Sequence, residues 1–493
     1  MNENTGIAVN EIMQQAKNAF ELYKKKPGNE RALFLQAIAD CIEEKRDVLV
    51  QTANEETNLP AARLNGEISR TTGQLKMFAN LIAEGSWVEA AIDTADLNRT
   101  PPKPDTRKML LPAGPVVVFG ASNFPFAFST AGGDTASALA SGSTVIIKGH
   151  SAHAKTSCLV FEAIQTAIKK TQMPAYTVQH ILGSGNTVGK ELVLHPYTTG
   201  VGFTGSLQGG KALVNYAQQR SIPIPVFAEM SSINPVVFLP GTLISNSTAL
   251  AQLFAGSITL GMGQFCTNPG LMIAMESEGL NNFLTQLAEA IAAIVPQKML
   301  HTGIYESYRN GLEKMLHQKG ITLVAQSAQT PLQQEAYPTV AKADAATFLQ
   351  NPHLHEEVFG PYSLMVICKD KEALIEVLHS AKGQLTATVM GTAEDFENHS
   401  DIIEIQTSLA GRVILNNAPT GVEVCASMVH GGPYPATTDA RFTSVGTSAV
   451  KRWVRPVCFQ NFTDALLPDA VKNNNPLGIW RLVNNQFTKE VTS

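Results

Sequence analysis

Short apolar runs alternate with helical stretches from residue 111 onward, and this alternation restricts the fold more than any other feature. The runs GPVVVFG, STVIIK, YTVQHIL and TTGVGF are rich in β-branched residues, and small-residue or amphipathic segments separate them. Strands that are apolar throughout are buried on both faces, which is typical of a parallel sheet covered by helices. We therefore predict a doubly wound α/β domain with ligands bound at the carboxyl ends of its strands.

A second α/β region is expected from residue 229 onward. Its predicted strands are NPVVFL, LMIAM, PYSLMVI, LTATVM and GRVILN. The residues before 84 have the apolar spacing of amphipathic helices, including one long helix after Pro27, and we expect them to cover the first sheet. Residues 87–110 are polar and contain prolines, which indicates an extended excursion. The tail WVRPVCFQNF could pair with the edge of a partner.

Composition limits the classes of partner. The chain has 493 residues, a formal charge of −5 and no block of lysine and arginine, so nucleic acid and anionic membranes are not expected partners. No stretch has the length and apolarity of a bilayer span or a signal peptide. The six cysteines show neither CxxC nor zinc-type spacing. We expect reduced thiols, a cytoplasmic location and no metal site.

One cysteine stands among small, flexible residues. Cys266 lies in GSITLGMGQFCTNPGL, where Gly261, Gly263 and Gly270 let the backbone expose a thiolate. Taken alone, a buried structural cysteine is the commoner role. Glu229 ends the apolar run PIPVFAE, where a carboxylate is either paired or tuned as a base. If the two side chains converge, they supply a nucleophile and a base that activates water.

Polar residues follow the strands of the first domain. Asn123 in GASNFP could donate to an oxyanion or close an Asx-turn. Lys148 ends VIIK, and Ser151 follows it; such groups suit phosphate or ribose contacts but are also ordinary at a solvated strand end. The turn in GFTGSLQGG precedes a helix whose backbone N–H groups could face a nucleotide. The GxGxxG fingerprint is absent from this region.

The segments GASNFP, IIK, FTGS, AEMSSINP, GQFCTNPG and EEVFGP, in this order, resemble the NAD(P)-dependent aldehyde dehydrogenase superfamily over nearly the whole chain. The segments FAEMSSINPVVFLP, GQFCTNPGL, APTGVEV and HGGPYPATTD are similar to the branch that contains alpha-ketoglutaric semialdehyde (2,5-dioxovalerate) dehydrogenases. The resemblance implies two doubly wound α/β domains and a small β oligomerisation element. It implies a homodimer or homotetramer. It also implies a cofactor-binding domain of residues 1–88 and 109–228, a catalytic domain of residues 229–450, and oligomerisation or arm segments of residues 89–108 and 451–493.

The resemblance also implies roles. Cys266 would attack the aldehyde, the Asn123 amide and the Cys266 N–H would hold the oxyanion, and Glu229 would activate the water that hydrolyses the thioester. Because relatives that transfer the acyl group to coenzyme A lack this carboxylate, Glu229 favours release of a free acid. The implied cofactor-binding positions are Lys148, Ser151, Gly205, Ser206, Gly210, Glu357 and Phe359.

Two positions depart from the family pattern. Ser231 and Ser232 stand where most relatives carry a glycine pair, which puts the local turn in question. Ser151 stands where relatives that prefer NAD commonly place a glutamate. A glutamate at this position would repel the 2′-phosphate of NADP, and Ser151 does not. We therefore expect NADP to be accepted or even preferred, with NAD as the other candidate cofactor.

The substrate and the function class leave alternatives. We expect oxidation of alpha-ketoglutaric semialdehyde, with medium- or long-chain aldehydes or a broad aldehyde range as the alternative, because four phenylalanines suggest apolar walls: Phe124, Phe126, Phe128 and Phe265. Arg412 and Arg441 are carboxylate-binding candidates by position only. A cysteine hydrolase or acyltransferase is disfavoured because no histidine lies in a motif typical of that class. An inactive nucleotide-binding structural protein is disfavoured by the joint presence of Asn123, Glu229 and Cys266.

Overall fold

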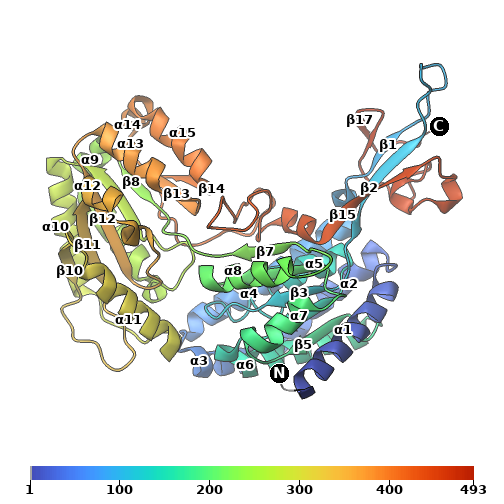
Figure 1. Ribbon diagram of the computed structural model, residues 1–493, viewed down its shortest axis with the longest axis horizontal. Coiled ribbons are helices and arrows are strands. Elements are labelled where there is room, and N and C mark those ends of the chain that lie inside the picture. Colours follow the sequence, from blue (N-terminus) through green and yellow to red (C-terminus); the bar gives the residue numbers. More distant parts are fainter. Residues whose placement is uncertain (1–2, 493) are drawn as a thin grey trace.

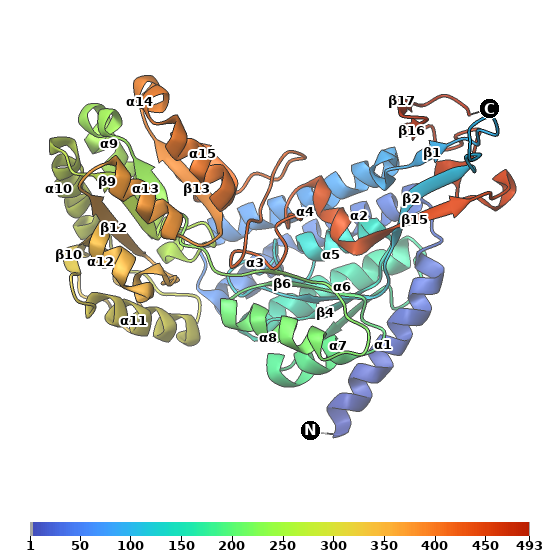
Figure 2. The same ribbon diagram turned by 45° about the horizontal axis from the view of Figure 1, so that its top comes forward.

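The computed structural model describes residues 3–492, whose strands form three sheets (Figure 1). A five-stranded parallel sheet has the order β5-β4-β3-β6-β7, and a seven-stranded sheet has the order β10-β11-β12-β9-β8-β13-β14 with only β10 antiparallel. The third sheet, β15-β2-β1-β16-β17, projects as an arm that is visible in both Figure 1 and Figure 2. This architecture confirms the predicted α/β fold with a small β element.

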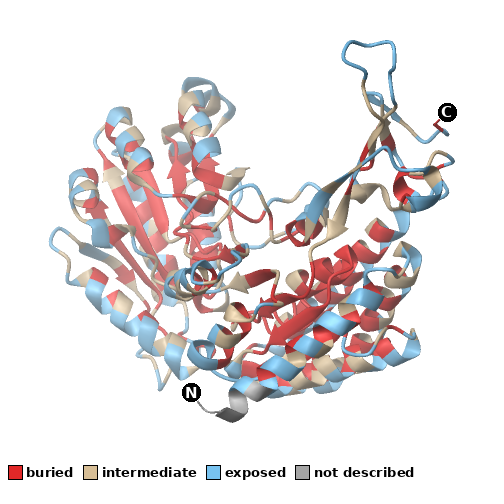
Figure 3. Ribbon diagram, turned by 45° about the vertical axis from the view of Figure 1, so that its right-hand side comes forward, coloured by how far each residue is buried: buried red, intermediate tan, exposed pale blue. Residues whose placement is uncertain are grey.

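The first sheet consists of the predicted apolar runs. Its strands are β3 (Val116–Phe119), β4 (Val145–Lys148), β5 (Val178–Ile181), β6 (Gly200–Thr204) and β7 (Val226–Glu229). Every residue of β3 and β4 is buried, as expected for strands covered on both faces, and Figure 3 shows the strands of the first sheet mostly buried beneath helices whose outer faces are exposed. The helices of this body are α1 (Glu3–Tyr23), α2 (Gly28–Glu43), α3 (Arg46–Thr57), α4 (Ala61–Glu84), α5 (Gly133–Ser141), α6 (Ala154–Lys170), α7 (Lys190–Leu194) and α8 (Leu207–Gln218).

The long helix predicted after Pro27 is wrong. The chain forms two helices, α2 and α3, because Lys45 leaves the helical conformation with φ −106° and ψ 10°. The break lets α3 contact α6 and α4 in a direction of its own. Periodicity did not reveal it because the apolar spacing continues on both sides of Lys45.

The second body carries the seven-stranded sheet. Its strands are β8 (Val236–Phe238), β9 (Leu271–Met275), β10 (Thr322–Gln326), β11 (Thr339–Asp344), β12 (Tyr362–Cys368), β13 (Gln384–Met390) and β14 (Ala410–Leu415). Strands β10 and β11 lie in a stretch for which no strand was predicted. The helices are α9 (Pro240–Thr259), α10 (Glu278–Ala293), α11 (Thr302–Leu316), α12 (Ala345–Gln350), α13 (Lys371–Ser380), α14 (Ala393–Asn398) and α15 (Ser400–Leu409).

After β14 the chain returns to the first body and then enters the arm. The 3₁₀ segment η6 (Thr447–Trp453) contacts α5, and Trp453 is buried in the core of the first sheet. The arm strands are β1 (Ala91–Asp93), β2 (Thr106–Pro112), β15 (Val454–Gln460), β16 (Arg481–Val483) and β17 (Gln486–Thr488). Of the helices within residues 3–492, not one combines the length and apolarity that crossing a membrane requires.

Candidate active site

Glu229 and Cys266 reach the same place from different sheets. Glu229 is the last residue of β7, and its carbonyl accepts a hydrogen bond of 3.0 Å from the Gly205 N–H after β6. Cys266 lies in the loop between η4 (Leu260–Gly263) and β9 of the other sheet. The site therefore lies at the carboxyl edge of the first sheet, which is where a doubly wound fold binds its ligands.

The loop before Cys266 has an unusual backbone. Gly261, Met262 and Gly263 have φ values of 52°, 53° and 62°. A Cβ atom on Gly263 would lie 2.2 Å from the Gly360 carbonyl oxygen, so only glycine permits this approach. The approach brings the loop of the cysteine against the segment that contains Glu357.

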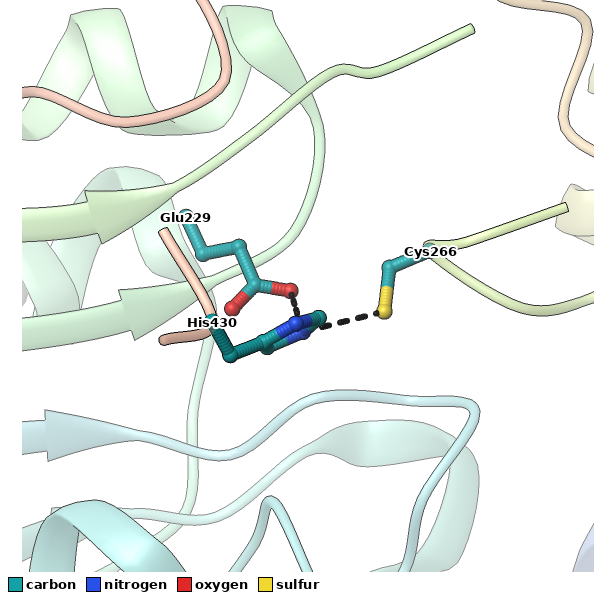
Figure 4. Close-up of side chains that lie close together, drawn as sticks. All are labelled: Glu229, Cys266 and His430. Carbon is teal, nitrogen blue, oxygen red and sulfur yellow. Dashed lines mark hydrogen bonds and ion pairs between the residues drawn. The ribbon is translucent and has the colours of Figure 1, made fainter. Parts of the chain in front are cut away.

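A histidine lies between the thiol and the carboxylate (Figure 4). The His430 Nε2 atom lies 3.4 Å from Cys266 Sγ and 3.1 Å from Glu229 Oε1. The Ser444 hydroxyl donates to Glu229 Oε2 at 2.9 Å. The His430 side chain is fully buried, and its Nδ1 atom has no hydrogen-bond partner among the described residues. A nucleophile, an imidazole and a carboxylate thus share one small space.

The return of the chain after β14 carries His430 to this place. The Met230 N–H donates to the Ala436 carbonyl at 2.8 Å, and the Thr438 N–H donates to the Ala228 carbonyl at 3.1 Å, so this segment runs beside β7. No histidine was expected near Cys266, and here the structure differs from the sequence reasoning. The only signal was the position of His430 at the head of HGGPYPATTD, a segment that contributed to the resemblance without a role for its histidine.

The electrostatics separate the two ionisable partners. Burial raises the pKa of Glu229, but His430, Ser444 and Cys266 together outweigh burial and leave the pKa of this carboxyl below its ordinary value. Burial, followed by the charge of Glu229, holds the pKa of the Cys266 thiol well above its ordinary value. The protein without ligands therefore favours a thiol beside a carboxylate.

Asn123 lies against the nucleophile loop. Its side-chain Nδ2 atom donates to the Gln264 backbone carbonyl at 3.1 Å, and the backbone carbonyl of Asn123 accepts from Arg63 Nη2 at 2.7 Å. A side-chain amide carries two N–H donors, so one remains for a ligand beside Cys266. The position is compatible with the oxyanion role, which stays a prediction.

One of the two serines that replace the family's glycine pair, Ser232, fastens the turn after Glu229. The Ser232 hydroxyl donates 2.9 Å to Gln384 Oε1 and accepts from the Leu385 N–H at 3.0 Å. The Ile233 N–H donates to the same Gln384 oxygen at 2.7 Å. The turn after Glu229 is thus fastened to the start of β13, which answers the question that the serines raised about its conformation.

The predicted cofactor positions lie along the edge of the first sheet. Lys148 ends β4 and is only 8% exposed; burial lowers its pKa, and no acidic side chain in the described part of the chain opposes that effect. Ser151 is exposed and begins the 3₁₀ turn η2 (Ser151–His153). The serine places no negative charge at this strand end.

The turn after β6 meets the residues next to Glu229. Ser206 caps α8 by accepting from the Gly209 N–H at 3.1 Å, and a Cβ on Gly210 would lie 2.5 Å from Met230 Sδ. Close packing at Gly210 therefore presses the start of α8 against the residue after Glu229. A buried lysine without an acidic partner and a helix amino end at one sheet edge fit the ribose and phosphates of a nucleotide.

Glu357 and Phe359 come from the second body and line a recess with Ser232 and Phe265. Burial raises the pKa of Glu357 to about 7, against the opposing effects of Ser231 and Ser232. Such a carboxyl can accept hydrogen bonds from ribose hydroxyls when ionised. Its place in the recess beside Phe265, the residue before Cys266, is compatible with the predicted cofactor role.

An aromatic wall adjoins the thiol. Phe124 packs edge-on against Phe128 and Phe265, with ring centroids 5.3 and 5.6 Å apart, and Phe128 lies 6.1 Å from the His430 ring. Phe126, also expected in this wall, is instead buried in the core of the first body. Its orientation follows the local turn, which apolar character alone does not reveal.

Comparison with known proteins decides the family. The aldehyde dehydrogenase family pattern matches residues 1–434. The chain belongs to the aldehyde dehydrogenase family. An alpha-ketoglutaric semialdehyde dehydrogenase of Azospirillum brasilense is 48% identical to this aldehyde dehydrogenase over 477 residues, 96% of this chain and 90% of the relative. One from Acinetobacter baylyi is 46% identical over 483 residues, 98% of this chain and 91% of the relative.

A solved structure shows the same fold at lower identity. Betaine aldehyde dehydrogenase from Staphylococcus aureus superposes with a TM-score of 0.79 at 18% identity, covering 92% of this chain and 88% of the other. The family membership confirms the enzyme class expected from the order of the motifs. The protein is an NAD(P)-dependent oxidoreductase that converts an aldehyde to a carboxylic acid.

The active site of this aldehyde dehydrogenase also contains a donor set of the type that zinc prefers. The donor atoms of Glu229, Cys266 and His430 all lie within 4.8 Å of one another. Thiolate, imidazole and carboxylate are the common ligands of Zn²⁺. Cysteine spacing did not suggest such a set because its three members come from distant parts of the chain.

Proposed function

We propose that this aldehyde dehydrogenase oxidises alpha-ketoglutaric semialdehyde (2,5-dioxopentanoate) to 2-oxoglutarate with NADP or NAD. The observation that carries the proposal is the convergence of the Cys266 thiol, the His430 imidazole and the Glu229 carboxylate beside the nucleotide edge. Two relatives of that name, 48% and 46% identical over nearly the whole chain, support the substrate.

Covalent catalysis begins at the sulfur. Cys266 Sγ bonds to the aldehyde carbon, and the thiol proton leaves to the His430–Glu229 pair, whose nitrogen lies 3.4 Å from the sulfur. The free N–H of the Asn123 amide and the Cys266 N–H donate to the oxyanion of the thiohemiacetal. Because the Cys266 thiol is poorly ionised, it becomes a nucleophile when the His430–Glu229 pair accepts its proton.

The carbon of the thiohemiacetal loses a hydride as its oxyanion becomes the thioester carbonyl, and the cofactor, when it is bound, would supply the acceptor for that hydride. Lys148, Ser151 and the turn at Gly205 and Ser206 would hold its ribose and phosphates, with Gly210 keeping the helix start close. Glu357 and Phe359 would contact it from the second body. Ser151 leaves room for a 2′-phosphate, so we propose that NADP is used at least as well as NAD.

The thioester on Cys266 is then hydrolysed. Glu229, held by Ser444 and His430, accepts a proton from water as the water oxygen bonds to the acyl carbon. The carbon–sulfur bond breaks, and a free acid and the Cys266 thiol result. The low pKa of Glu229 keeps it ionised and ready to accept this proton at neutral pH.

We also propose the division into a cofactor-binding unit of 1–88 and 109–228, a catalytic unit of 229–450 and an arm of 89–108 and 451–493. The arm would join copies into a homodimer or homotetramer. Strand β15 is an edge strand paired only with β2, and the arm exposes Phe487 and Leu466 by 77% and 72%. Six free cysteines fit a cytoplasmic location. A molar mass from light scattering equal to one chain would contradict the assembly.

The formation of reduced cofactor tests the proposal. The enzyme is assayed with 2,5-dioxopentanoate, glutaraldehyde and hexanal, with NAD and NADP in turn. We expect the highest kcat/KM for 2,5-dioxopentanoate with NADP, and a Ser151→Glu variant that shifts the ratio toward NAD. The aromatic wall makes uncharged aldehydes the second candidate substrates. A higher kcat/KM for hexanal than for 2,5-dioxopentanoate would favour that alternative.

A further inference from the structure

Two arginines on α4, Arg63 and Arg70, pack against the phenylalanine rings of the aromatic wall. The guanidinium carbon of Arg63 lies 5.0 Å from the Phe124 ring centre and 4.7 Å from that of Phe265. The guanidinium carbon of Arg70 lies 5.9 Å from Phe124 and 5.2 Å from Phe128. Residues seven apart share one face of a helix, so both cations extend from the same face of α4 and contact the same aromatic wall.

The two cations differ in their partners. Arg63 Nη2 donates to the backbone carbonyl of Asn123 at 2.7 Å and so helps to hold the main chain of that residue, although its Nη1 atom has no partner among the described residues. Arg70 forms neither a hydrogen bond nor an ion pair with a described residue, and its Nη2 atom is buried without a partner. Glu67, which lies between them on α4, instead accepts from the Phe126 and Ala127 N–H groups at 2.8 and 2.9 Å.

An unpaired guanidinium in such a place needs an explanation. Arg70 is only partly exposed, so part of its hydration is lost, and no anion among the described residues replaces that hydration by a direct hydrogen bond. Guanidinium groups bind carboxylates through paired hydrogen bonds and remain charged when partly buried. The missing partner is therefore an anion that arrives with a ligand.

Arg70 also lies within electrostatic reach of the nucleophile. Its charge lowers the pKa of the Cys266 thiol, although burial and Glu229 raise that pKa more strongly. Glu229 and Glu423 are the other acids that act on Arg70, besides Glu67. The geometry agrees, because the Phe128 ring lies 5.2 Å from the Arg70 guanidinium and 6.1 Å from the ring of His430, which contacts Cys266. One short molecule can thus place an aldehyde at Cys266 and a carboxylate at Arg70.

The arginines named by sequence position do not fit this role as well. Arg441 is paired with Asp439 at 2.6 Å, and its side chain is 82% exposed. Arg412 donates from Nη1 and Nη2 to the carbonyls of Gly421 and Pro419 at 2.9 and 2.6 Å, so only its Nε atom has no partner among the described residues, whereas both terminal nitrogens needed to pair with a carboxylate are engaged.

We propose that Arg70 binds the carboxylate of the substrate, so that the enzyme selects oxo acids over uncharged aldehydes. Arg63 and the aromatic wall of Phe124, Phe128 and Phe265 hold the Arg70 side chain in place. This inference rests on the proposed function, because it requires a substrate with an aldehyde at one end and a carboxylate at the other. The aromatic wall then has a second purpose: it holds the guanidinium by cation–π contact and carries the apolar part of the substrate chain.

The test is the substrate preference of Arg70→Met, which keeps much of the length of the side chain and removes its charge. We expect the ratio of kcat/KM for 2,5-dioxopentanoate to that for hexanal to fall about ten- to a hundredfold, mainly through KM, as expected for a lost charge-assisted hydrogen bond. Arg70→Lys should retain part of the preference. Arg441→Met is the matched control, and its ratio should equal that of the wild type.

A second readout does not depend on the semialdehyde. Glutarate should inhibit hexanal oxidation competitively in the wild type and at least about tenfold more weakly in Arg70→Met. Equal losses with both aldehydes, together with unchanged inhibition by glutarate, would overturn the role of Arg70. If the wild type oxidises hexanal and not 2,5-dioxopentanoate, the proposed substrate fails, while the glutarate series still decides whether Arg70 binds a carboxylate.

Discussion

The Nε2 atom of His430 lies 3.4 Å from the Sγ atom of Cys266, and the same nitrogen lies 3.1 Å from a carboxylate oxygen of Glu229. A single ring nitrogen cannot donate to both neighbours and accept from one at the same time. The three groups therefore form one hydrogen-bonded unit, and a substitution of any one of them is expected to change the environment of the other two.

Replacing the imidazole should slow catalysis strongly. In His430→Gln the side chain can still form hydrogen bonds but cannot exchange a proton with Cys266. We expect kcat to fall about 10²- to 10⁴-fold, the usual contribution of general acid–base catalysis. The control is His317→Gln, an exposed histidine at the end of α11. Steady-state assays across pH check this, and a variant as active as the control would exclude a role for His430 in proton transfer.

The reactivity of Cys266 should rise steeply with pH in the protein without ligands. Because burial and Glu229 raise the thiol pKa well above its ordinary value, the thiolate fraction should grow about tenfold per pH unit through the neutral range. Glu229→Gln removes the carboxylate charge, so the thiol pKa should fall and alkylation at pH 8 should become faster. Iodoacetamide labelling of the Cys266 peptide measures both effects, with exposed Cys458 as the internal control. Slower labelling in Glu229→Gln would contradict the assigned sign.

Zinc should inhibit the enzyme reversibly. Zinc bonds of about 2.3 Å to sulfur and about 2.0 Å to nitrogen place tetrahedral ligands roughly 3.5 Å apart, close to the present separation of Cys266 and His430. We expect inhibition by micromolar Zn²⁺ that EDTA reverses, and at least about tenfold weaker binding to His430→Gln. Substitution with Co²⁺ should give an absorption band from the thiolate in the wild type alone. Equal zinc affinity of the two proteins would show that the metal binds elsewhere.

The backbone before Cys266 should tolerate no side chain at residue 263. Gly263→Ala combines a φ of 62° with a Cβ 2.2 Å from the Gly360 oxygen, and we expect a loss of about 1–3 kcal/mol in the free energy of unfolding together with loss of activity. Gly256→Ala in α9 is the matched control, because its Cβ would have no neighbour within 4 Å. There we expect a gain of roughly 0.5–1 kcal/mol. Thermal unfolding of the two variants in parallel provides the measurement, and equal melting temperatures would contradict this reading of the loop.

The features that could be predicted from the sequence are those encoded by residues adjacent to one another in the chain. Apolar runs such as Val116–Phe119 predicted the parallel strands directly, since burial on both faces leaves a pattern in a few adjacent residues. The motifs around Cys266 and Glu229 identified the enzyme family through their order along the chain. Both kinds of signal survive without knowledge of any long-range contact.

The rest of the site depended on contacts between distant residues. His430 is 164 residues from Cys266 and 201 from Glu229, so no spacing rule could connect them. Arg70 lies on a helix that was expected only to cover a sheet, where a polar position is normally solvated. The role proposed for it depends on the position of the helix beside Phe128, whose ring lies between Arg70 and His430 in the chain of contacts.

The most direct test of the covalent mechanism is mass spectrometry of the Glu229→Gln variant after rapid mixing with 2,5-dioxopentanoate and NADP. Loss of the carboxylate should slow hydrolysis more than it slows attack by the sulfur. We predict a burst of reduced cofactor that matches the enzyme concentration, with the mass of the acyl group on the Cys266 peptide. Reduced cofactor formed while Cys266 remains unmodified, or an acyl group on a different residue, would contradict the account.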